Sequence, residues 1–65
     1  MKRTGLLRYL NKNKCFLLRE GKKHSVFYNF ENDKTSTIPR HRGIDDLLAN
    51  KICRDLGIPE IKKRK

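Results

Sequence analysis

Two very short connections in the middle of this chain constrain its fold more than any other feature. Three runs have the composition of β-strands, CFLLREG, HSVFYNF and TSTI, and they are connected through the turn-forming segments EGKK and ENDK. Loops this short join antiparallel neighbours, because a parallel pair needs a long crossover connection. The segment therefore predicts a three-stranded antiparallel sheet, with Gly21 supplying a backbone conformation that other residues disfavour and Pro39 ending the third strand.

Helical periodicity precedes the first strand. Leu6, Leu7 and Leu10 form one apolar stripe. Thr4 is a candidate N-cap, since a threonine side chain can accept a hydrogen bond from a backbone N–H of the first turn. The pattern predicts a helix over about residues 4–13.

A second helix is expected after the third strand. Asp45 and Asp46 in its first turn suit the helix dipole, and Gly57 and Pro59 end it. Its expected core stripe consists of Ile44, Leu47, Leu48, Ile52 and Leu56. The order α-β-β-β-α predicts an α+β fold in which both helices cover one face of the sheet and the other face stays open.

The length of 65 residues limits both the core and the kind of site. A domain of this size buries only about 60% of the surface of its unfolded chain, so it cannot enclose a deep substrate cavity. We expect one domain over residues 1–58 and a basic, frayed tail over 59–65. Any chemistry must then take place on an open face.

Positive charge dominates the composition. Seventeen lysines and arginines against seven acids give a net charge of +10, which attracts polyanions. The alternative is a basic protein without a polyanionic partner. The sequence has neither a signal-peptide pattern nor an apolar run of membrane-spanning length, so we expect a cytoplasmic protein that does not enter a membrane.

The other reactive side chains exclude several chemistries. Cys15 and Cys53 do not form a C-x-x-C pair and are expected to be buried thiols. His24 and His41 lack the ligand spacing of a zinc site. Because no glycine-rich phosphate loop is present either, we expect no metal and no small-molecule cofactor.

His24 follows Lys22 and Lys23 at the start of the second strand. RNA cleavage requires a base that removes the proton of a ribose 2′-hydroxyl and cations that stabilise the developing phosphate charge. The ordinary pKa of histidine, about 6.5, suits this proton transfer. The alternative is a solvated turn histidine beside solvated lysines, which is the usual state of charged loop residues.

Three segments, in this order, resemble the HicA toxins of HicA–HicB toxin–antitoxin systems. They are the helix GLLRYLNKN, the segment KKHSVFYN, and TIPRHRGIDDLLANKICRDLGI with its P-x-H-like element and closing helix. The resemblance covers about residues 4–58. It implies a fold like that of double-stranded-RNA-binding domains and metal-independent cleavage of mRNA.

The resemblance also implies roles for particular residues. It makes His24 the catalytic group, and it places His41 at the start of the closing helix, where we expect it to contact RNA rather than to catalyse. Lys22 and Lys23, with Arg40 and Arg42, are expected to hold the RNA backbone. The expected partner is an acidic HicB-like antitoxin that covers this basic face.

The chain also departs from the family pattern. Lys22 and Lys23 stand where the family commonly has Gly-Ser before the histidine. Phe30 stands where many members have proline, so we expect its side chain to be exposed. Either Phe27 or Tyr28 must face away from the helices, to stack on a base or to pack on a neighbouring strand. Two other functions stay open, a non-catalytic RNA-binding module and a DNA-binding protein.

Overall fold

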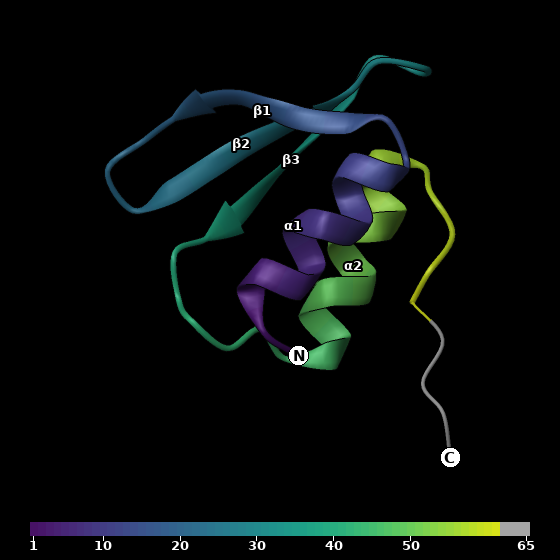
Figure 1. The fold of residues 1–65 in the computed structure, drawn as a ribbon. Coiled ribbons are helices and arrows are strands. Elements are labelled where there is room, and N and C mark those ends of the chain that lie inside the picture. Colours follow the sequence, from purple (N-terminus) through teal and green to yellow (C-terminus); the bar gives the residue numbers. More distant parts are fainter. Residues whose placement is uncertain (62–65) are drawn as a thin grey trace.

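The computed structural model describes residues 1–61 of the chain. Its elements are α1 (Arg3–Lys12), β1 (Cys15–Glu20), β2 (His24–Asn29), β3 (Lys34–Pro39) and α2 (Asp46–Leu56). The strands form one antiparallel sheet in the order β1-β2-β3, and both helices lie against one of its faces (Figure 1). The predicted α-β-β-β-α layout is confirmed.

The register of the sheet decides which side chains face the helices. Along β2, Ser25, Phe27 and Asn29 are buried, whereas His24 is exposed. Successive strand residues point to opposite faces, so His24 belongs to the open face. The pairing of β1 with β2 is irregular between Leu17 and Arg19, where a bulge adds one residue to β1.

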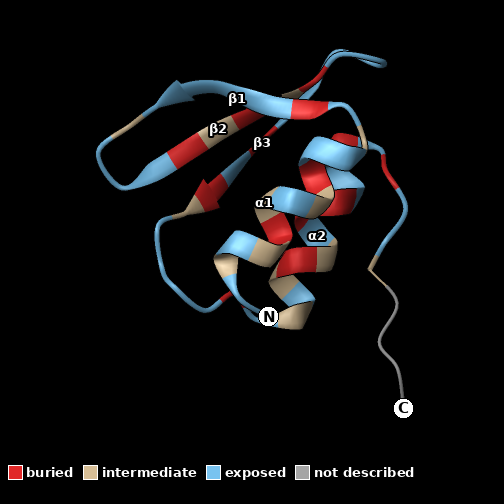
Figure 2. Cartoon of the chain, in the orientation of Figure 1, coloured by how far each residue is buried: buried red, intermediate tan, exposed pale blue. Residues whose placement is uncertain are grey.

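The core lies between the helices and the inner face of the sheet, where the buried residues are concentrated (Figure 2). Its buried members are Leu6, Leu10, Cys15, Phe27, Ile38, Ile44, Ala49, Ile52, Cys53, Leu56 and Ile58. This single layer of apolar contact is what a chain of 65 residues can form, and it leaves the outer face of the sheet uncovered.

The predicted cap of α1 is wrong. The helix begins at Arg3, its N-cap is Lys2, and no side chain caps it. Backbone contacts replace the cap, because the Arg3 N–H donates to the Arg42 carbonyl at 2.7 Å and Lys2 forms a β-bridge with Gly43. A pairing of segments about 40 residues apart thus determines where α1 starts.

The predicted core stripe of α2 is wrong at one position. Leu47 is 79% exposed, whereas Ala49, Ile52, Cys53 and Leu56 are buried. Residues two apart on a helix differ by about 200° in direction, so Leu47 points away when Ala49 faces the core. The inner stripe of α2 thus combines the small residues Ala49 and Cys53 with the larger Ile52 and Leu56.

The end of α2 agrees with its sequence. Gly57 has φ +71°, in the left-handed region where glycine is favoured. The following residues contact the helices, because the Tyr9 hydroxyl donates to the Pro59 carbonyl at 2.8 Å and the Ile61 N–H donates to Asn50 Oδ1 at 2.8 Å. Of the tail expected to be frayed, 59–61 are therefore bound to the domain, and 62–65 lie outside the described residues.

Candidate functional site at one end of the sheet

His24 opens β2 at the end of the sheet where β1 turns into β2 and β3 leaves the sheet (Figure 1). Its Cα partner on β3 is Pro39, and its carbonyl accepts a hydrogen bond from the Gly21 N–H at 2.8 Å. These contacts fix the backbone of His24 and leave its side chain exposed on the open face. The imidazole is thus accessible to a large substrate.

Gly21 has a different role from the one expected. Gly57 is the only glycine with a positive φ among residues 1–61, so Gly21 is not required for a left-handed conformation. A Cβ atom on Gly21 would instead lie 3.1 Å from the carbonyl oxygen of His24. Glycine is favoured here because the backbone of the turn passes close to His24.

Arg40 connects the β1–β2 turn to the loop between β3 and α2. Its Nη2 donates to the Gly21 carbonyl at 3.0 Å and lies 3.0 Å from a carboxylate oxygen of Glu20. Lys22 and Lys23 are exposed in the turn that Arg40 contacts. The structure thereby brings these lysines, His24 and Arg40 to one end of the sheet.

His41 and Arg42 lie in the same β3–α2 loop, and both are exposed. The backbone of this loop is held by α1, since the Arg42 carbonyl accepts the N–H of Arg3. All the predicted site residues therefore come from two segments, 22–24 and 40–42, that meet at one end of the sheet.

Arg3 also belongs to this end of the sheet, although no sequence pattern predicted it. Its Nε donates to the Pro39 carbonyl at 2.9 Å and its Nη2 donates to Ser25 Oγ at 2.8 Å. Ser25 is only 1% exposed, so this bond satisfies a buried hydroxyl directly after His24. No local pattern marks these contacts, because the partners are 36 and 22 residues away along the chain.

The aromatic residues gather at the other end of the open face. Phe27 is buried, so Tyr28 faces outward, where its ring and that of Phe30 have centroids 4.7 Å apart. The Phe16 ring lies 5.9 Å from that of Phe30, which is 63% exposed. Tyr28 donates a hydrogen bond to Asp33, and this bond raises the pKa of Tyr28. The outward aromatic side chain thus packs on its neighbours, and Phe30 is exposed, as expected from the absence of a proline at this position.

The two thiols are buried and free, as predicted. Desolvation raises the pKa of Cys15 and that of Cys53, which disfavours the thiolate form. A buried neutral thiol is a poor nucleophile. Within residues 1–61, the structure has no group of three or more side chains that could hold a metal ion.

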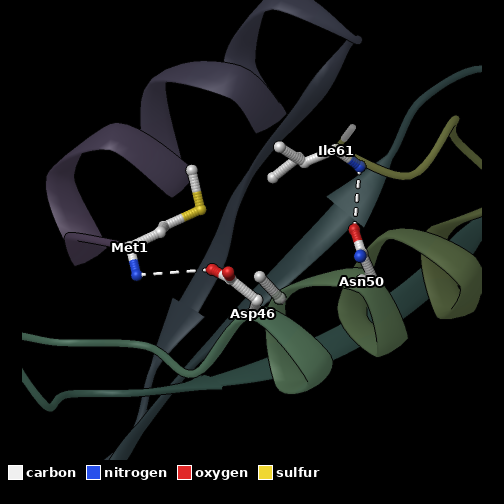
Figure 3. A pocket seen from close by; sticks show the side chains of 5 residues that line it. Met1, Asp46, Asn50 and Ile61 are labelled. Carbon is white, nitrogen blue, oxygen red and sulfur yellow. Dashed lines mark hydrogen bonds and ion pairs between the residues drawn. The ribbon is translucent and has the colours of Figure 1, made fainter. Parts of the chain in front are cut away.

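A hollow of about 320 Å³ lies apart from His24, lined by Met1, Asp46, Ala49, Asn50 and Ile61 (Figure 3). Its polar groups are already engaged. The amine of Met1 lies 3.6 Å from the Asp46 carboxylate, and Asn50 accepts the Ile61 N–H. The bond between Asn50 and Ile61 holds the segment after α2 against that helix. The residues that line the hollow add no reactive group beyond the Met1 amine and the Asp46 carboxylate.

Comparison with known proteins adds no identification, since no protein family, no curated protein and no solved structure matches this chain. In the described part of the chain, no helix is long and apolar enough to cross a membrane.

Proposed function

We propose that this protein is a metal-independent endoribonuclease that cleaves mRNA, the toxin of a toxin–antitoxin pair. The environment of His24 is the observation that carries the proposal. Its imidazole is exposed at the end of the sheet, beside Lys22, Lys23 and Arg40. The net charge of +10 supports a polyanionic substrate. The resemblance to HicA toxins supports the choice of His24 over His41.

In the proposed reaction, His24 removes the proton of a ribose 2′-hydroxyl. The 2′-oxygen attacks the adjacent phosphorus while the bond from phosphorus to the 5′-oxygen breaks, and the imidazolium returns its proton to that oxygen. The products carry a 2′,3′-cyclic phosphate and a 5′-hydroxyl. Lys22 and Lys23 stabilise the added negative charge on the phosphate. The substrate supplies its own nucleophile, so a shallow site with one titrating side chain suffices.

A partner follows from the same proposal. An uninhibited nuclease of this kind would damage its own cell, and an acidic HicB-like antitoxin that covers the basic end of the sheet would block His24 and the cations together. Both proteins would act in the cytoplasm, where mRNA is translated.

The second candidate is an RNA-binding module without catalysis, and one observation favours it. Within residues 1–61, the imidazole of His24 makes no hydrogen bond that would orient it. Catalytic bases are usually held by another group, although such bonds often form only with substrate bound. A binding module would need His24 only as a contact to the RNA backbone.

The two candidates differ in what His24→Ala does to RNA cleavage. We expect purified protein to cut single-stranded RNA in the presence of EDTA, and His24→Ala to lower the rate by about 10²–10⁴-fold, the usual contribution of a general base. His41→Ala is the matched control, because it removes the other exposed histidine of the same end. We expect it to lower the rate by less than about 10-fold, the loss of one contact to the RNA.

The chemistry of the products gives an independent check. Cleavage through the 2′-hydroxyl leaves cyclic phosphate ends, which mass spectrometry distinguishes from linear phosphates. If the parent protein binds RNA and leaves it intact, the binding module is correct. If His24→Ala cuts as fast as the parent, His24 is not the catalytic group.

A further inference from the structure

A basic cleft lies beside the proposed site, between the start of α1 and the β3–α2 loop. Its volume is about 600 Å³, and it is lined by Lys2, Arg3, Thr4, Arg40, Arg42 and Gly43. The β-bridge between Lys2 and Gly43 and the bond from the Arg3 N–H to the Arg42 carbonyl hold its two walls together. The cleft therefore exists only in the folded chain.

The lining of the cleft is strongly one-sided in charge. Four of its residues are cationic and none is acidic. The nearest acid in contact is Glu20, which pairs with Arg40 from outside the lining. The start of α1 adds to the positive field, since its first turn contains no acidic residue and no side-chain cap.

The cations of the cleft have two kinds of role. Arg3 and Arg40 are held by hydrogen bonds to backbone carbonyls, so their guanidinium groups are already oriented. The side chains of Lys2 and Arg42 make no hydrogen bond or ion pair within residues 1–61. Two oriented guanidinium groups and two unpaired cations suit an oxyanion with several acceptor oxygens.

We infer that this cleft binds a phosphate group of the RNA chain, at a position separate from the phosphate at His24. The inference rests on the proposal that RNA is the substrate, and it is independent of whether His24 is the catalytic group. Lys2 and Arg42 provide the charge that neutralises the phosphate. Arg3 and Arg40 provide oriented N–H donors, since Arg3 uses two of its five donors in the bonds to Pro39 and Ser25.

The position of the cleft indicates the path of the RNA. Arg3 reaches Ser25, whose side chain faces the helices, so the wall of the cleft that Arg3 forms lies on the helix side of the sheet. His24 lies on the opposite, open face. An RNA strand that occupies both positions passes around the end of the sheet, over the turn that carries Lys22 and Lys23.

The test measures binding without cleavage. The probe is a single-stranded 2′-O-methyl RNA, which keeps its phosphates and lacks the nucleophile, so any failure of the catalytic proposal does not affect the result. Fluorescence anisotropy gives the affinity of the parent and of Lys2→Gln/Arg42→Gln between about 0.1 and 1 M KCl. Each phosphate contact on a single strand contributes about 0.7 to the slope of log affinity against log salt concentration.

We expect the double variant to reduce that slope by about 0.7, the contribution of one phosphate, which corresponds to about 5-fold weaker binding at 0.1 M salt and a vanishing difference near 1 M. Arg42→Gln alone should reduce it by less than about 0.7, because Lys2 still neutralises part of the phosphate charge. A DNA strand of the same sequence should show the same reductions, because the cleft recognises phosphate.

Arg8→Gln/Lys12→Gln is the matched control, since it removes the same charge from exposed positions outside the cleft. It should leave the slope unchanged. An equal slope for parent and Lys2→Gln/Arg42→Gln would overturn the inference and would favour an acidic protein as the ligand of the cleft. Equal reductions by the control pair, or no binding of RNA by the parent, would overturn it as well.

Discussion

Asn29 links the end of β2 to the end of α2 through a buried amide. Asn29 is only 2% exposed. Its Nδ2 donates to the Leu56 carbonyl at 2.7 Å, and its Oδ1 accepts a hydrogen bond from the Glu31 N–H at 2.8 Å. Asn29→Ala removes both bonds and leaves a small void. At about 1 kcal/mol for each bond, with a further contribution from the void, we expect a loss of about 2–3 kcal/mol in the free energy of unfolding.

That loss is large for this chain. Domains of about 65 residues are stable by roughly 3–10 kcal/mol, and each kcal/mol corresponds to about 4–8 °C in Tm. We therefore expect the Tm of Asn29→Ala to fall by about 10–20 °C. Urea and thermal unfolding followed by circular dichroism measure both quantities.

Asn32 provides a matched control within the same contact. Its Nδ2 donates to the same Leu56 carbonyl at 3.0 Å and its Oδ1 accepts the Lys34 N–H at 3.0 Å, but Asn32 is exposed. Water can replace these bonds, so Asn32→Ala should cost no more than about 1 kcal/mol. Equal losses for Asn29→Ala and Asn32→Ala would show that burial does not determine the cost and would refute the reasoning.

Three further predictions concern stability and reactivity. Gly57→Ala should lower the free energy of unfolding by about 1–2 kcal/mol, because φ +71° is strained for any residue with a Cβ atom; a variant as stable as the parent in urea would contradict this. Leu47→Ser should change it by less than about 0.5 kcal/mol, whereas Ile52→Ala should cost about 2–5 kcal/mol, and a reversed order would place Leu47 in the core. Cys15 and Cys53 should react with a thiol reagent at neutral pH only after denaturation, because burial excludes the reagent and raises the pKa of both thiols; rapid labelling of the native protein would show that they are accessible.

The proposed site and the basic cleft lie at one end of the sheet, and the aromatic cluster lies at the other. His24 and the cations lie where the hairpin turns, and the aromatic cluster of Phe16, Tyr28 and Phe30 lies at the other end of β2. The buried contacts of Asn29 are at the aromatic end, and those of Arg3 are beside His24. Stability and substrate contact can therefore be tested by substitutions at different places.

Local sequence was enough to predict the order of the elements and the antiparallel sheet. The loops between the strands are only a few residues long, and connections this short can join only antiparallel neighbours. The periodicity of Leu6 and Leu10 and the left-handed end at Gly57 are also local properties, and the structure agrees with them. The position of His24 at the start of a strand followed from the same local pattern.

Only the tertiary structure decided which residues meet at the site. Arg3 reaches Pro39 and Ser25, and Lys2 pairs with Gly43, across separations that no local period encodes. The same contacts replace the predicted Thr4 cap. The physical reason is that a helix pattern gives the apolar stripe only approximately, whereas the packing of α1 and α2 on one sheet fixes how each helix is rotated and which loop its end contacts.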